Sequence, residues 1–105
     1  MADFTTERLV YSPEENISSN TKVIFGGDYY ITTAAVITLP NTNMIDRGTI
    51  TFKKRQGVSP TIQVLSGSGH VIRVQDREQD TNITFDIDVE IIMIWNDSQL
   101  RWEKE

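Results

Sequence analysis

The sequence contains no cysteine, a single histidine and no long apolar run. Without cysteine the chain can form neither a disulfide bond nor a thiolate metal site. With one histidine it cannot build a metal site or a proton relay that requires a histidine pair. No stretch approaches the roughly 20 apolar residues of a membrane-spanning helix. We therefore expect no cofactor, no metal site and no membrane span.

Positive charge is also scarce in this chain. The 105 residues include ten lysines and arginines and fifteen aspartates and glutamates, so the formal net charge is −5. A protein that holds nucleic acid through its phosphates needs a surplus of positive charge, so we expect no nucleic-acid partner. The first residues, Met1 to Thr5, lack the basic and apolar regions of a secretory signal, which favours synthesis in the cytosol.

The clearest pattern in the sequence is an alternation of side chains between Ile83 and Trp95. Every second residue is apolar, which is typical of a β-strand with one buried face. The intervening positions are polar up to Glu90 but apolar at Ile92 and Ile94. A strand with two apolar faces needs cover on both, so Ile92 and Ile94 are candidate contacts between copies of the chain. We expect Ile92→Asp to disturb association more than folding.

Short strand-like segments fill most of the remaining chain, with a turn signal about every 8 to 12 residues. One helical turn is expected at Thr42 to Asp46. The pattern predicts an all-β domain, an antiparallel sandwich, barrel or prism. We expect residues 1–20 to form an N-terminal arm or docking segment and residues 21–105 to form the single β-rich domain. The predicted strands are Arg8 to Tyr11, Thr21 to Phe25, Tyr29 to Thr32, Ala35 to Leu39, Thr49 to Lys54, Thr61 to Leu65, His70 to Val74, and a final hairpin within Asn82 to Trp102.

No set of residues in the sequence has the pattern of a catalytic centre. Ser66 and Ser68 lie too close to His70 along one local turn to build a spatially assembled triad. Two rows of alternating carboxylates could bind a calcium ion, but a solvated strand face is the more economical interpretation. We predict a protein without enzymatic activity and without catalytic, cofactor or metal residues. The carboxylate rows are Asp76, Glu78, Asp80 and Asp86, Asp88, Glu90.

Aromatic side chains offer one alternative function. Tyr29, Tyr30 and Trp102 are candidate ligand contacts, because aromatic rings can form a platform on which a sugar stacks. Trp95 lies on the alternating apolar face, so we assign it to the core. This alternative predicts a module that binds a receptor or a carbohydrate such as a host-surface glycan.

From Ala35 onward the order of segments resembles a small β-rich module of phage tail fibres and head-decoration proteins. The match covers about two thirds of the chain, and Ser98 stands where the family usually has glycine. The segments that carry the resemblance are Val36 to Pro40, Asp46 to Lys54, Thr61 to Val64, Ser66 to Gly69, Asn82 to Phe85, and Ile91 to Trp102.

The resemblance implies a non-enzymatic bacteriophage structural protein at the virion surface, such as a capsid decoration (cement) protein or a short fibre or adaptor. It implies a homotrimer, made in the host cytoplasm, whose partner is a capsid or tail protein of the same virion. In that picture the segment from Met1 to Asn20 docks on the partner. The resemblance also implies a turn near Asp86 to Asp88, which would divide the alternating stretch into two strands.

Overall fold

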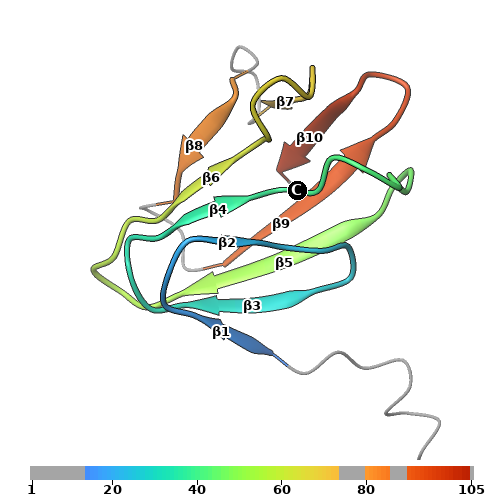
Figure 1. Ribbon diagram of the computed structural model, residues 1–105. Helices are drawn as coiled ribbons and strands as arrows, with labels where there is room; N and C mark the ends of the chain where they lie inside the picture. Colours follow the sequence, from blue (N-terminus) through green and yellow to red (C-terminus); the bar gives the residue numbers. More distant parts are fainter. Residues whose placement is uncertain (1–13, 74–79, 86–89, 105) are drawn as a thin grey trace, which may run out of the picture.

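The computed structural model describes residues 14–73, 80–85 and 90–104, and these residues form ten β-strands and no helix (Figure 1). The prediction of an all-β domain is therefore confirmed. Within these residues no helix has the length and apolar character needed to cross a membrane. The strands form two sheets that face each other across one shared core, which makes the domain a β-sandwich.

The larger sheet has six strands in the spatial order β1-β3-β5-β9-β10-β7. They are β1 (Glu15–Ile17), β3 (Asp28–Ile31), β5 (Thr49–Lys54), β7 (Val71–Arg73), β9 (Glu90–Asn96) and β10 (Arg101–Lys104). The smaller sheet has four strands in the order β2-β4-β6-β8. They are β2 (Thr21–Lys22), β4 (Val36–Thr38), β6 (Thr61–Gln63) and β8 (Asn82–Thr84).

The chain winds between the two sheets as a flattened coil. From β1 to β8 consecutive strands alternate between the larger and the smaller sheet, so that β1, β3 and β5 are parallel neighbours, as are β2, β4 and β6. Among the strand pairs of the described residues, the β9–β10 hairpin, the β5–β9 pair and the β6–β8 pair are antiparallel. The expectation of an antiparallel domain is thus corrected, because most turns carry the chain across to the other sheet instead of folding it back beside itself.

The alternation seen in the sequence sets which side chains enter the core. In β5, Ile50 and Phe52 are buried, whereas Thr49 is exposed on the opposite face. In β9, Met93 and Trp95 are buried. The Cα positions of Ile50 and Met93 are paired across the two strands, so inward side chains meet in register. The buried core comprises Ile17, Val23, Tyr29, Ile31, Ala35, Ile37, Leu39, Ile50, Phe52, Ile62, Val64, Ile72, Phe85, Ile91, Met93, Trp95 and Trp102.

Two sequence-based boundaries need correction. Ile17 is buried and β1 pairs with β3, so the sandwich begins before residue 20 and the predicted arm does not extend to that position. The predicted helical turn at Thr42 to Asp46 is not helical: residues 42–43 form a bend and residues 46–47 a turn, and the backbone φ is positive at Asn43 (52°) and at Arg47 (65°). The predicted strand at residues 8–11 lies outside the described residues.

We expect Gly48→Ala to lower the free energy of unfolding by about 1–3 kcal/mol, as overpacking usually does. A Cβ atom at Gly48 would lie 2.6 Å from the Phe25 ring and 2.9 Å from the carbonyl oxygen of Ile45. Neither neighbour can retreat easily, because the Phe25 ring is stacked on Trp102 and the Ile45 oxygen is a backbone atom that accepts a hydrogen bond from the Gly48 N–H. Urea unfolding followed by circular dichroism measures the effect. The substitution Ser66→Ala, at an exposed position, is the control, and equal stability of the two variants would contradict the expectation.

Candidate interaction surfaces

Loops from three parts of the sequence meet at one end of the sandwich, which we call the loop end (Figure 1). It is formed by the segments 22–28, 40–48 and 97–101. The backbone N–H of Gly26 donates to the carbonyl of Thr49, the residue that directly follows the second segment, at 2.8 Å, and the N–H of Asp97 donates to Asp46 Oδ1 at 3.0 Å. These hydrogen bonds hold the three segments together.

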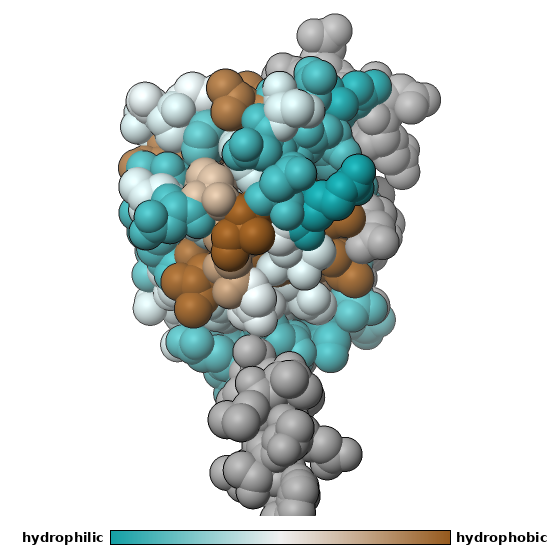
Figure 2. Space-filling model, turned by 90° about the vertical axis from the view of Figure 1, so that its right-hand side faces the viewer, coloured by the Kyte–Doolittle hydropathy of each residue, from teal (hydrophilic) through white to brown (hydrophobic). Residues whose placement is uncertain are grey.

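The loop end carries large apolar side chains that are exposed to solvent and are not part of the core. Ile24 is 67% exposed, and Ile45 and Leu100 are each 54% exposed, and they are the exposed large hydrophobic residues among those the structure describes. Figure 2 views the molecule from this end and shows apolar side chains near the centre of the face, bordered by hydrophilic ones. Exposed apolar patches bordered by polar residues are common at protein–protein contacts, which makes this face a candidate interaction surface.

A groove of about 420 Å³ lies between the first two segments of the loop end. Its walls are mostly apolar, and its charged member is Lys22. The Asn41 Oδ1 atom is buried without a hydrogen-bond partner among the described residues. Such a groove can bind an apolar side chain of another protein, and removing that side chain from water stabilises the complex. The lining residues are Lys22, Val23, Ile24, Phe25, Pro40, Asn41, Thr42, Asn43 and Ile45.

The predicted contact residues Ile92 and Ile94 lie on a different surface, the outer face of the larger sheet. Both side chains point away from the core and are half-buried. Their cross-strand neighbours on β5 are Thr51 and Thr49, and Glu103 on β10 lies beside Ile94. This face is therefore less exposed and less apolar than the loop end.

The Arg101–Glu103 ion pair also belongs to the outer face. Arg101 Nε lies 2.7 Å from Glu103 Oε2, and Asn96 donates a further hydrogen bond to the same oxygen at 3.2 Å. The hydrogen bond from Arg101 is the main cause that lowers the pKa of the Glu103 carboxyl. The end of the hairpin nearest Ile94 is thus covered by charged, mutually paired groups.

The structure does not assemble the predicted aromatic platform. Trp102 is fully buried between Phe25 and Trp95, with ring centroids 5.2 and 5.4 Å away, and Tyr29 is buried as well. The Tyr29 hydroxyl accepts a hydrogen bond from the Ile24 N–H, and burial raises its pKa. Both rings occupy inward positions of their strands, so neither can stack on a ligand. Of the three candidates only Tyr30 points outward, and it is half-buried.

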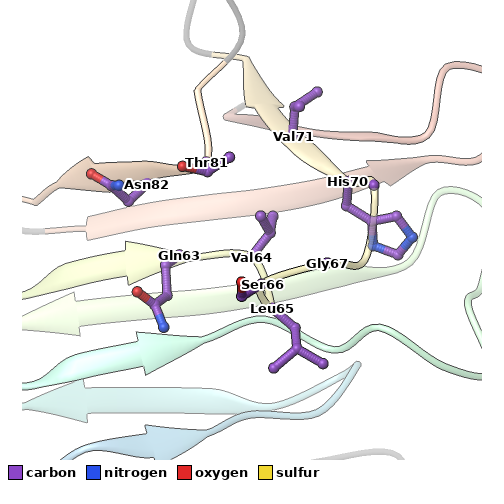
Figure 3. Close-up of a pocket in the computed structure, with 10 residues that line it drawn as sticks. Gln63, Val64, Leu65, Ser66, Gly67, His70, Val71, Thr81 and Asn82 are labelled. Carbon is purple, nitrogen blue, oxygen red and sulfur yellow. The ribbon is translucent and has the colours of Figure 1, made fainter.

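A second pocket, of about 410 Å³, surrounds His70 where the chain leaves β6 and enters β7 (Figure 3). The His70 ring packs against Trp95 with centroids 4.5 Å apart. The Ser68 hydroxyl accepts a hydrogen bond from the backbone N–H of His70, not from its ring. The polar ends of Gln63 and Asn82 lie on the opposite side of the pocket from the imidazole in Figure 3. The polar groups therefore do not converge on a point where a reacting atom could sit.

We expect the contribution of His70 to stability to be lost in acid. Burial lowers the pKa of its imidazole from the ordinary value of 6.5, so the unfolded chain binds this proton more readily than the folded one. The contribution is complete above pH 6.5 and declines as the pH falls from there through the folded-state pKa. Urea unfolding of the wild type and of His70→Gln, at about pH 7.5 and about pH 5.5, measures it. A stability difference between the two proteins that does not change with pH would contradict it.

The charged clusters of the sequence do not gather into a site in the part of the chain that the structure describes. Of the six candidate carboxylates only Asp80 and Glu90 belong to that part, and it holds no group of three or more potential metal ligands. The basic run 53–55 is split: Lys53 faces outward near Glu14 at 3.6 Å, whereas Lys54 is buried with its Nζ 5.6 Å from the centre of the Phe85 ring.

Ile24 and Ile45 are the interaction candidates that sequence reasoning missed. It assigned Ile24 to the end of a strand and Ile45 to a helical turn, where an apolar side chain is expected to be buried. Their sequence surroundings could have indicated exposure, since Ile24 shortly precedes a Gly-Gly turn and Ile45 lies in a polar stretch. Comparisons with protein-family models, with curated proteins and with solved structures found no match for this chain.

Proposed function

We propose that this chain is a non-enzymatic structural protein of a bacteriophage particle, a homotrimer that acts by binding at the virion surface. The capsid decoration protein and the short fibre or adaptor are the two forms of this role that its sequence pattern favours. The observation that carries the proposal is the concentration of exposed apolar side chains, Ile24, Ile45 and Leu100, at one end of a sandwich whose core is otherwise closed.

The construction of the domain suits a structural role. Hydrogen-bonded strands run through both sheets, and the largest side chains are fully buried between them. A sandwich of this kind presents its loops at fixed positions, so that little ordering accompanies binding. The resemblance of residues 35–102 to phage fibre and decoration modules supports the placement on a virion.

Immunodetection on purified particles tests the proposal. An antibody against the recombinant protein is applied to phage particles released from a strain that carries the gene and purified on a density gradient. We expect gold label on the capsid or tail in electron micrographs, and none on particles from a strain with the gene deleted. Protein confined to the soluble fraction of the lysate would contradict the virion role. Size-exclusion chromatography with light scattering tests the trimer, and a monomer at micromolar concentration would contradict it.

A further inference from the structure

We propose that the loop end is the contact surface between copies of this chain in the trimer, with Leu100 of each copy seated in the Ile24–Ile45 groove of the next. This inference rests on the proposed function and identifies the surface by which it assembles. It replaces the outer face of β9, with Ile92 and Ile94, as the place of self-association.

The exposure of the side chains points to the loop end. Ile24, Ile45 and Leu100 are each more than half exposed, whereas Ile92 and Ile94 are already half-covered within their own chain. Removal from water stabilises a contact in proportion to the apolar area that it covers. The loop end therefore gains more from a partner than the outer face does.

The shape of the loop end supplies the two halves of a contact. The groove of about 420 Å³ lies beside Ile24 and Ile45, and Leu100 stands outside it on the β9–β10 turn. Leu100 has a positive backbone φ of 53°, a backbone conformation that residues other than glycine, asparagine and aspartate seldom adopt. Leu100 is the knob of this contact. Because the knob and the groove are different patches of one surface, each copy contacts the next head-to-tail. Such contacts close into a ring when the rotation between copies is right, and a trimer is one such ring.

The charges of the loop end suit an assembly of identical acidic chains. The whole chain carries a formal net charge of −5, so copies repel one another on average. The three loop-end segments, however, contain three cations and three anions, and their net charge is zero. Arg101 is already paired with Glu103 of its own chain, but the exposed Lys22 and Arg47 can face the exposed Asp46 and Asp97 of the next copy. Identical faces can therefore meet there with less like-charge repulsion than elsewhere on the chain. The charged residues are Lys22, Arg47, Arg101, Asp28, Asp46 and Asp97.

The loop end is held in position before any partner arrives. The Arg47 N–H donates to the Trp95 carbonyl at 2.8 Å, and the Trp95 N–H donates to the Gly48 carbonyl at 2.9 Å. These bonds tie the segment that carries Ile45 to β9, immediately before the turn that carries Leu100. A fixed arrangement of knob and groove lowers the ordering cost of association.

Light scattering on single variants tests the inference. We expect the wild type to be a trimer and Ile45→Asp and Leu100→Asp to be monomers with unchanged circular dichroism and thermal unfolding, because both side chains lie outside the core. Ile92→Asp is the matched control and should remain a trimer. Trimers formed by both loop-end variants, together with a monomeric Ile92→Asp, would overturn the inference and leave the proposed function standing. A monomeric wild type would overturn both. Loop-end variants that stay trimeric but no longer bind phage particles would give this face to a virion partner instead, and would also overturn the inference.

Cross-linking tests the same contact without disturbing it. Because the chain has no cysteine, introduced cysteines are the sole sites for a short bismaleimide reagent. We expect Thr42→Cys combined with Ser98→Cys to give covalent trimers, since these positions flank the groove and the knob. Gln56→Cys combined with Ser98→Cys should give none, because Gln56 follows β5 at the opposite end of the sandwich. Equal cross-linking of the two double variants would argue against the contact.

Discussion

Trp102→Ala is expected to lower the free energy of unfolding by about 3–5 kcal/mol, the usual cost of emptying a core position of this size. Trp102 is fully buried, and its strand β10 joins β9 on one side to β7 on the other. Its ring also supports Phe25, through which the β2–β3 loop is held to the core. Since domains of this size are stable by about 5–15 kcal/mol, a large fraction of the variant should unfold at mild urea concentrations. Urea unfolding followed by Trp95 fluorescence measures the loss.

Trp102→Phe and Trp95→Phe are the matched controls. The Trp102 Nε1 atom is buried without a hydrogen-bond partner among the described residues, so phenylalanine keeps an aromatic ring there and gives up no hydrogen bond. The Trp95 Nε1 atom donates to Asp97 Oδ1 at 2.9 Å, so Trp95→Phe should lose this hydrogen bond as well. The added loss is about 0.5–1.5 kcal/mol. If Trp102→Phe proved as damaging as Trp102→Ala, the effect would not come from lost ring volume.

The sequence was most informative about which face of a strand is buried. Alternation in the second half of the final stretch placed Met93 and Trp95 inward and Ile92 outward, and the structure has all three on those sides. Period-two patterns predict faces well because a shift by one residue would expose every apolar side chain of a strand at once.

Connectivity could not be predicted in the same way. A glycine-rich turn such as Gly26-Gly27 permits a tight reversal, but it does not specify whether the next strand pairs with the preceding one or crosses to the other sheet. Here β2 and β3 lie in different sheets, and β3 pairs with β1 and β5 instead. The edge strand β1 was missed because its three residues contain one apolar side chain, Ile17, which is too little for a detectable period.

The candidate surfaces depended on exposure, which the sequence reports poorly outside regular strands. Tyr29 and Trp102 were proposed as ligand contacts because aromatic rings can form a platform for a sugar, yet both take inward positions in short strands. Ile45 was assigned to a helical turn, whereas it lies in irregular backbone between a bend and a turn, and its side chain is in solvent. Where backbone φ turns positive, as at Arg47 and Leu100, side-chain direction no longer follows a simple period.

Ile50→Asp is expected to destabilise the fold by about 4 kcal/mol or more, which would remove much of the stability of a domain of this size. Ile50 is fully buried on β5, the strand that joins the parallel part of the larger sheet to the antiparallel hairpin. Its cross-strand neighbour on β9 is Met93, so a carboxylate at this position would face an apolar side chain. A buried charge without a partner either unfolds the protein or must take up a proton. Circular dichroism at neutral pH measures the folded fraction.

Thr49→Asp is the control that shows whether the effect depends on which face of β5 carries the charge. The two substitutions introduce the same charge at adjacent residues of β5, but Thr49 is exposed on the outer face, so its change in stability should stay within about 0.5 kcal/mol. Lowering the pH separates the two causes of unfolding. If the charge is responsible, protonation of the aspartate should return part of the lost stability to Ile50→Asp relative to Ile50→Asn, which cannot ionise. Equal damage from Ile50→Asp and Ile50→Asn at neutral pH would show that lost apolar packing, and not charge, determines the stability at the centre of this sheet.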